Sequence, residues 1–399
     1  MPRIVFATLG ARGDVFPYLS VARELQKRGH KPVIATAESY RAEVEALGLT
    51  FQPVRPDSPR GADIRRAMHP ISGGEWLFRR HLLPVLRESI EDLRPICVQA
   101  AILVTHTTTL AGPIVAALQQ PRGLKWVSSA VSPLARFESD VALPSWPRAA
   151  DFPALNRALL WLLKRQFGMY LKETQQIRAA LGLSRGDNAL WSDAHSPLLQ
   201  LCLWDEKFAP VSEVKLRRAV GFCTLEAESA PDSALSDWLQ AGEPPVVFVA
   251  ASFSHSPSWE RESERAAEIM GRRALLLGAA SNHDSETVVR RTFASLSAIS
   301  PRAAALVHAG GVGTLAQGLK FGVPMLLCPR AHDQPDNARR ARRLGVARVL
   351  APRHYRGERI ACEIEALLGD DAARARLQEW RQRPQNGAQN AADALEALL

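Results

Sequence analysis

The sequence predicts an α/β protein of two doubly wound domains, and three observations support this fold class. Short apolar runs alternate with helical segments through residues 1–224, and a second such series starts with the apolar run at 244–250. Between them lies a polar, acidic stretch at 225–242 that is poor in strand-forming residues. Alternation of this kind is typical of parallel sheets with helices on both faces. A chain of 399 residues, 46% of them hydrophobic, is long enough for two such domains.

The first domain, residues 1–224, opens with a strand, a turn and a helix. Residues 3–9 are apolar, 10–15 form the turn, and 16–29 carry helical periodicity. Further strands are predicted near 31–36, 101–105, 124–129, 199–203 and 217–221. Asp14 lies in the turn, at the carboxyl end of the first strand, where open parallel sheets bind ligands. Two interpretations stay open for it, a helix N-cap or a catalytic base.

The segment 225–242 is predicted as an interdomain linker. The second domain is expected to span 243–380 and to begin with the strand at 244–250. Residues 381–399 are helical in pattern, with breaks at Pro384 and Gly387.

A glycine-rich turn in the second domain predicts a diphosphate site. The apolar run 303–307 is followed by His308, then by Gly310, Gly311, Gly313 and Thr314, and then by a helical segment at 315–321. Strand, glycine turn and helix direct free backbone N–H groups and the positive end of a helix dipole at one point. The His308 imidazole and the Thr314 hydroxyl would add donors. The competing interpretation is a tight turn that binds nothing.

A second polar pair follows the next apolar run. Residues 324–329 are predicted as a strand, and Asp333 and Gln334 come shortly after it. A carboxylate and an amide at the carboxyl end of a strand suit the hydroxyl groups of a sugar, since together they accept and donate. Diphosphate on one side and polyol on the other indicate a nucleotide sugar.

These motifs resemble the donor-binding half of the UDP-glycosyltransferase superfamily, which has the GT-B fold. The family pattern is H-x-G-G-x-G-T, then G-V-P, then D-Q-x-x-N-A. This chain matches it at His308, Gly310, Gly311, Gly313, Thr314, Gly322, Val323, Pro324, Asp333, Gln334, Asn337 and Ala338. The resemblance implies two facing Rossmann-like domains with a cleft between them, a last helix that returns to the N-terminal domain, and no required metal or other cofactor besides the sugar donor.

The same resemblance assigns a role to the first turn. Many members carry G-H-x-x-P there, with the histidine as general base, whereas this chain has Asp14 at that position, between Gly13 and Phe16. The form R-G-D-V-x-P, which begins here at Arg12, is typical of the branch that glycosylates sterols, lipids and antibiotic aglycones and includes rhamnosyltransferases. Asp14 is therefore expected to be the base, in a turn that faces the acceptor. His106, which follows the strand at 101–105, is the next candidate.

The chain also departs from the family pattern. Ala251 and Ser252 stand where members have G-S beside the donor phosphates, and Ser297 ends a segment that lacks the usual Pro and His beside the nucleobase. Gln317 is nearest to the position of the ribose-binding acid. We expect Ser252, Ser297 and Gln317 to contribute to the donor site. The choice between uridine and thymidine stays open.

Charge and composition exclude some partners. The net charge is +9, yet no nucleic-acid-binding motif or basic tail is present, so nucleic acid is not an expected partner. The five cysteines are dispersed, as in reduced cytoplasmic proteins, and no metal-ligand cluster or membrane-spanning run is seen. Residues 156–172 mix apolar and basic side chains. This segment either lies on an anionic membrane, giving peripheral contact at its inner face, or packs as an amphipathic helix on its own domain.

Together these features predict an inverting glycosyltransferase that moves a hexose from a UDP- or dTDP-sugar to a hydroxyl of an apolar small molecule or lipid. Two other functions remain open. A nucleotide-sugar epimerase has a related donor half, and a catalytically silent binding partner of another glycosyltransferase would keep the donor motif without transfer. The sugar, the acceptor and the oligomeric state are not predicted.

Overall fold

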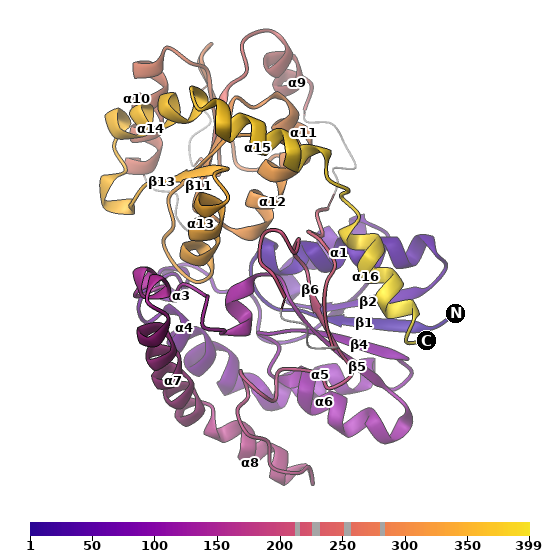
Figure 1. The fold of residues 1–399 in the computed structure, drawn as a ribbon. Coiled ribbons are helices and arrows are strands. Elements are labelled where there is room, and N and C mark those ends of the chain that lie inside the picture. The colour runs from indigo at the N-terminus through magenta and orange to yellow at the C-terminus, as the bar shows by residue number, and fades with distance from the viewer. Residues whose placement is uncertain (212–215, 226–231, 251–256, 280–283) are drawn as a thin grey trace. The chain divides into compact units, whose positions relative to one another are not determined.

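The computed structural model describes residues 1–399 except 212–215, 226–231, 251–256 and 280–283. The chain folds into two compact units (Figure 1). The first contains Met1–Thr224 together with Asn386–Leu399, and the second contains Leu225–Gln385. Each unit is built on its own parallel sheet, so the α/β class with two doubly wound domains expected from the sequence is confirmed.

The first unit has a seven-stranded parallel sheet in the order β3-β2-β1-β4-β5-β6-β7. Its strands are β1 (Arg3–Ala7), β2 (Lys31–Thr36), β3 (Thr50–Pro53), β4 (Ile102–His106), β5 (Lys125–Ala130), β6 (Leu199–Cys202) and β7 (Arg217–Ala219). The central strands β1 and β4 are mostly apolar and buried, because helices cover both faces of a parallel sheet. Strand order reverses between β1 and β4, and this is the place where doubly wound sheets bind ligands.

The helices of this unit connect the strands. They are α1 (Arg12–Lys27), α2 (Arg41–Ala46), α3 (Ala62–Ala67), α4 (Gly73–Glu75), α5 (Leu86–Ile96), α6 (Ala111–Gln119), α7 (Pro153–Tyr170), α8 (Lys172–Ala180) and α16 (Gly387–Glu396). A π-helical segment, Trp76–Leu82, follows α4.

The second unit repeats the same strand order on a smaller sheet, β10-β9-β8-β11-β12-β13. Its strands are β8 (Val246–Val249), β9 (Ala274–Leu277), β10 (Val288–Arg291), β11 (Ala305–His308), β12 (Met325–Leu327) and β13 (Ala347–Val349). Its helices are α9 (Ser233–Gln240), α10 (Pro257–Met270), α11 (Leu296–Ile299), α12 (Val312–Phe321), α13 (Gln334–Arg343), α14 (Gly357–Leu368) and α15 (Asp371–Gln382). The order reverses between β8 and β11, so β11 borders this sheet's ligand position.

The last helix, α16, packs on α1 within the first unit (Figure 1). The Arg28 guanidinium pairs with Asp393 at 2.6 Å and with Glu396 at 2.7 Å. Nδ2 of Asn390 donates to the carbonyl of Val220 at 2.9 Å. These contacts account for the assignment of the C-terminal segment to the first unit.

Several elements differ from the sequence-based expectation. The first helix begins at Arg12 instead of residue 16, so Asp14 lies inside its first turn. Strand β3 was not predicted. The stretch 225–242, expected to be a linker, contains α9, because the Asp232 carboxylate accepts from the N–H of Leu235 and caps that helix. Trp238 of α9 donates to the carbonyl of Glu286, which places the helix in the second unit. In the described part of the chain, no helix is both long and apolar enough to cross a bilayer.

Candidate active site

Asp14 is held in the first turn of α1 by its own neighbours. Its Oδ2 atom accepts from the N–H of Ala11 at 2.9 Å, and its backbone carbonyl accepts from the Thr8 hydroxyl at 2.7 Å. Gly10 has a φ of +145°, and a Cβ atom there would lie 2.3 Å from Asp14 Oδ2. Glycine is therefore required for the carboxylate to occupy this position. Asp14 is thus not the N-cap of α1, which is Ala11, although its carboxylate accepts from the N-cap N–H with one of its two oxygens.

His106 ends β4, the strand next to β1, and approaches the other oxygen. Its side chain is 5% exposed, and Nε2 lies 3.8 Å from Asp14 Oδ1. Nδ1 is 2.7 Å from the Thr108 hydroxyl oxygen, and the Thr108 hydroxyl donates to the carbonyl of Leu9 at 2.5 Å. A hydroxyl has a single hydrogen, so Thr108 can only accept from Nδ1–H. The neutral ring therefore carries its proton on Nδ1, and the lone pair of Nε2 faces Asp14.

The facing atoms of this pair both accept hydrogen bonds. Two acceptors have no hydrogen to share, and the 3.8 Å between them is longer than a hydrogen bond. Burial lowers the pKa of His106, and the nearby Asp14 carboxylate acts in the opposite direction. The imidazole is therefore neutral at pH 7. Asp14 is one-third exposed, so the pair offers an accessible carboxylate with a proton-accepting nitrogen behind it.

The sequence missed Thr108 as the residue that sets the tautomer of His106. The available signal was the run of threonines at 107–109 directly after the strand. The other predicted residues of the first turn are less constrained. Arg12 is exposed and pairs with Glu43 at 3.1 Å, and a Cβ atom at Gly13 would meet no described atom within 4 Å. Phe16 is half-buried.

In the second unit, His308 ends β11 as a buried hydrogen-bond donor. Its Nδ1 atom accepts from the N–H of Gly310 at 3.1 Å, so the proton of the neutral ring is on Nε2. Among the described residues, Nε2 has no hydrogen-bond partner although it is buried. Burial lowers the pKa of His308 to about 3, so the ring stays neutral. An unsatisfied buried donor costs roughly 1–3 kcal/mol, so this N–H favours an acceptor atom beside it.

The glycines after His308 are required for two different reasons. Gly310 has a φ of +88°, and a Cβ atom there would lie 3.2 Å from the carbonyl oxygen of Gln334, so backbone conformation requires it. Gly311 precedes α12 and Gly313 is the second residue of that helix. A Cβ atom at Gly311 or Gly313 would meet no described atom within 4 Å. Packing therefore does not explain them, whereas an anion close to the backbone would. Thr314 is partly exposed beside them.

Asn337 joins the glycine turn to the second polar pair. Its Nδ2 donates to the carbonyl of Gly310 at 3.0 Å and to Asp333 Oδ2 at 2.8 Å. Oε1 of Gln334 accepts from the N–H groups of Arg330 and Ala331 at 2.9 and 3.1 Å. The Gln334 oxygen is therefore used by its own loop, and a sugar hydroxyl would have to meet its Nε2. The structure brings His308, the turn and Asp333 together through these contacts.

Three further donor candidates have different outcomes. Gln317 of α12 is 7% exposed, and its Oε1 has no partner among the described residues, so it can accept from a ligand hydroxyl. Ser297 lies in α11, with Oγ 3.0 Å from Oγ of Ser295. Ser252 lies outside the described residues.

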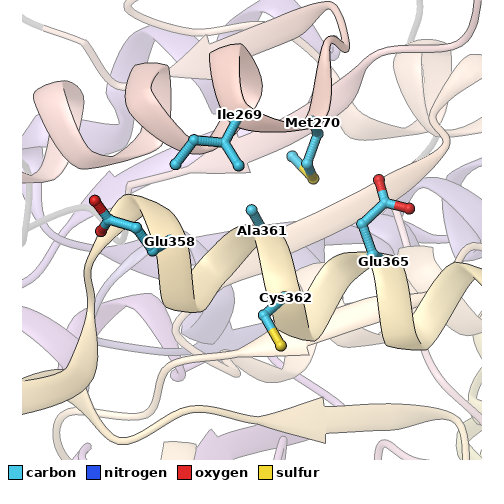
Figure 2. Close-up of a pocket in the computed structure, with 6 residues that line it drawn as sticks. All are labelled: Ile269, Met270, Glu358, Ala361, Cys362 and Glu365. Carbon is cyan, nitrogen blue, oxygen red and sulfur yellow. The ribbon is translucent and has the colours of Figure 1, made fainter.

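A separate hollow of about 470 Å³ lies between α10 and α14 (Figure 2). Its lining residues are Ile269, Met270, Glu358, Ala361, Cys362 and Glu365, none of which is a predicted site residue. Glu358 pairs with Arg265, and Glu365 with Arg272. The hollow therefore lacks the donors that an anionic ligand needs. In the described ranges, no group of three or more His, Cys, Asp or Glu residues could hold a metal ion.

Comparison with known proteins gives consistent matches to both halves. Residues 4–105 match the glycosyltransferase family 28 N-terminal domain, and residues 279–394 match the erythromycin biosynthesis protein CIII-like C-terminal domain. The chain is 28% identical to O-mycaminosyltylonolide 6-deoxyallosyltransferase of Streptomyces fradiae, over 99% of this chain and 97% of that protein.

Solved glycosyltransferase structures share the fold of this chain, so the GT-B type of fold expected from the sequence is confirmed. The glycotransferase of kitacinnamycin aligns with a TM-score of 0.72 at 22% identity over 100% of both chains. Spinosyn rhamnosyltransferase SpnG, complexed with thymidine diphosphate, aligns with a TM-score of 0.68 at 17% identity over 100% of both chains.

Proposed function

We propose that this chain, which belongs to the GT-B glycosyltransferase superfamily, transfers a hexose from a UDP- or dTDP-sugar to a hydroxyl of an apolar natural product or lipid, with inversion at the anomeric carbon. The observation that carries the proposal is the buried Nε2–H of His308, which has no partner among the described residues and lies beside a glycine turn that opens α12. A diphosphate supplies the acceptor oxygens that this donor and the turn's N–H groups require.

His308 would act on the leaving group. As the bond between the anomeric carbon and the diphosphate oxygen breaks, its electron pair passes to the diphosphate. The neutral Nε2–H and the N–H groups at the start of α12 stabilise that charge by hydrogen bonds already in place. The Oε1 atom of Gln317 is available to a donor hydroxyl, and the Asp333 carboxylate is assigned to the hexose.

Asp14 would act on the acceptor. The acceptor oxygen forms the new bond to the anomeric carbon and loses its proton to Oδ1 of Asp14. A solvated aspartate is a weak base at pH 7, because its pKa is about 4. Here the lone pair of His106 Nε2 lies behind Oδ1. A proton that arrives between these two acceptors can be held by both in a charge-assisted hydrogen bond.

The preference for an apolar acceptor rests on the aromatic side chains of the first unit. The ring of Phe167 in α7 lies 5.8 Å from that of Phe78 and 6.4 Å from that of Trp191. Phe137 stacks on Trp191 at 4.1 Å. The Streptomyces fradiae relative is named as a transferase that acts on O-mycaminosyltylonolide, and we propose an acceptor of that kind here.

An acceptor screen read by mass spectrometry tests the proposal. UDP-glucose and dTDP-rhamnose are each incubated with a panel of macrolides, polyketide aglycones and sterols, and the expected product is an acceptor heavier by one hexosyl or deoxyhexosyl group. Product formation should depend on both Asp14 and His308.

The two other functions give different results in the same assay. A nucleotide-sugar epimerase would convert the donor without any acceptor. A silent binding partner would bind nucleotide, seen as a raised Tm, without transfer to any acceptor of the panel. Either result would overturn the transfer reaction proposed for this chain.

A further inference from the structure

Helix α7 exposes a row of apolar side chains, interrupted only by Arg165 and Gln166, which we call the α7 stripe. The stripe consists of Ala154, Leu155, Ala158, Trp161, Leu162 and Met169. These residues recur at intervals that place them on one face of the helix. Leu155 is 51%, Trp161 59%, Leu162 54% and Met169 63% exposed. An exposed apolar face of this length on a helix is typical of a surface that binds a protein or a membrane.

The opposite face of α7 is firmly packed, so the stripe is not the result of a loosely attached helix. Leu160 is buried in a cluster with Val141 and Leu143. Asn156 is fully buried, and its Nδ2 donates to the carbonyls of Ser139 and Val141, both at 2.8 Å. The amphipathic-helix interpretation of residues 156–172 therefore holds for this face, whereas membrane contact stays a prediction for the exposed one. One face packs on its own unit, and the other remains available.

The charged side chains of α7 are all cations. Arg157, Lys164 and Arg165 lie on the helix, which has no acidic residue. Among the described residues, none of the three forms an ion pair with a carboxylate. The Arg165 guanidinium lies 5.8 Å from the ring centre of Trp161, within the stripe. An apolar stripe with unpaired cations beside it complements a surface that is apolar in depth and anionic at its rim.

We propose that the α7 stripe is the contact site for an anionic lipid bilayer. The helix would lie parallel to the membrane, with the stripe at the boundary between headgroups and acyl chains and the cations at lipid phosphates. Trp161 suits this depth, because its ring is amphipathic. At about 27 Å, α7 is long enough to anchor one unit to the surface. This inference is independent of the sugar-transfer reaction and goes beyond it.

A second copy of the chain fits the stripe less well. A symmetric contact through α7 would bring the same surface of both copies together. Arg157, Lys164 and Arg165 of the two copies would then approach one another without carboxylates between them. Phosphates of an anionic membrane offer these cations the charge that a second copy does not.

Vesicle sedimentation of the full chain tests the site. Vesicles of phosphatidylcholine with phosphatidylglycerol are compared with pure phosphatidylcholine at about 0.1 M salt. The wild type should pellet mainly with the anionic vesicles. The double variant Leu155→Glu/Leu162→Glu should lower the partition coefficient at least ~10-fold, because two anions replace apolar side chains that must enter the bilayer. Replacing Arg157, Lys164 and Arg165 by Gln should cost about fivefold per charge.

Ile269→Glu is the matched control, since Ile269 is 51% exposed on α10 in the second unit. It should pellet like the wild type, and all variants should keep the wild-type Tm and its rise with UDP. The proposal is overturned if the wild type stays in solution with anionic vesicles, or if the α7 variants and Ile269→Glu lose binding equally. It is also overturned if gel filtration without lipid shows a dimer that Leu162→Glu dissociates, because the stripe would then be a self-contact.

Discussion

At the scale of single residues, two histidines occupy equivalent places in the two sheets, and their Nε2 atoms have opposite hydrogen-bonding roles. His106 ends β4 and His308 ends β11, each the strand across the reversal of strand order from the first strand of its unit. Thr108 accepts from Nδ1 of His106, which leaves Nε2 as a proton acceptor. Gly310 donates to Nδ1 of His308, which leaves Nε2–H as a donor. One local hydrogen bond thus decides the chemistry of each ring.

His308→Ala should remove most of the rise in Tm that UDP or dTDP produces, measured against each variant's own ligand-free Tm. The reason is that the variant loses the buried donor assigned to the diphosphate. His308→Gln retains an N–H donor and should keep part of the response. His354→Ala, at an exposed histidine of the same unit, is the control and should respond fully. A full response in His308→Ala would exclude His308 from the site.

Asp14→Asn should reduce turnover at least ~100-fold while donor binding is retained, because a positioned base contributes about 10²–10⁴-fold. The variant keeps a side-chain oxygen for the N–H of Ala11, so the Tm should change little. Product formation by mass spectrometry and the Tm rise with UDP measure the two effects separately. Near wild-type turnover would mean that Asp14 only stabilises the start of α1.

The same substitution should lower the pKa of His106 further. Burial already lowers it and the Asp14 carboxylate raises it in opposition, so removal of that charge leaves burial opposed only by the hydrogen bond to the Leu9 backbone. An NMR titration of the His106 ring in wild type and Asp14→Asn measures the change. The ring of His195, a partly buried histidine elsewhere in the unit, is the control: the variant His195→Gln identifies its resonance, and its pKa should not change in Asp14→Asn. A His106 pKa that is equal in wild type and Asp14→Asn would show that the two groups do not interact.

At the scale of elements, the segment from β11 to α12 shows which glycines serve the fold and which serve a ligand. Gly310 is needed for its positive φ, and Asn337 of α13 holds the carbonyl of Gly310 in place. Gly313 lies in a helix, where glycine is about 1 kcal/mol less favourable than alanine, and no described atom occupies the space beside it. Packing in the described part of the chain therefore does not require glycine at this position, and the proposed diphosphate site would.

Gly313→Ala should therefore leave the free energy of unfolding unchanged or raise it by up to about 1 kcal/mol, yet weaken nucleotide binding. Gly310→Ala should lower the free energy of unfolding by roughly 1 kcal/mol or more, because alanine is strained at positive φ. Denaturant unfolding and UDP titration of both variants separate the two roles. Undiminished nucleotide affinity in Gly313→Ala would place the diphosphate away from α12.

At the scale of the whole molecule, buried histidines connect stability to pH in both units. Burial lowers the pKa values of His81, His106, His195 and His308. The unfolded chain, with histidine pKa values near 6.5, therefore binds more protons than the folded chain below that pH. Stability then rises with pH and is lost as the pH falls.

The Tm should accordingly decline as the pH is lowered from about 7 towards 4, starting near the ordinary histidine pKa of about 6.5. His308 alone can contribute up to about 1.4 kcal/mol per pH unit in this window, since its folded pKa is about 3. His308→Gln has no group to protonate there, so its Tm should decline less steeply. Parallel Tm profiles for the two proteins would show that His308 is not buried in the folded state.

The sequence by itself determined the two parallel-sheet domains and the glycine turn after β11. Both depend on information that is local in the chain, namely apolar runs of strand length and glycines in one motif. The helical character of α7 followed from the same kind of pattern. Short or weakly apolar elements did not: β3 has four residues, and α9 depends on a cap by Asp232 in a stretch that is otherwise polar.

Only the tertiary structure decided which atoms of the candidate site are available. Oε1 of Gln334 proved to be bound by its own loop, and the Nε2 atoms of His106 and His308 proved to be an acceptor and a donor. It also decided that α7 packs by one face and exposes the other. The physical reason is that each neutral imidazole carries one proton, and the nitrogen that holds it is set by hydrogen-bond partners that folding brings together. Thr108 donates to a carbonyl of Leu9, 99 residues away in the chain, and no sequence pattern records that contact.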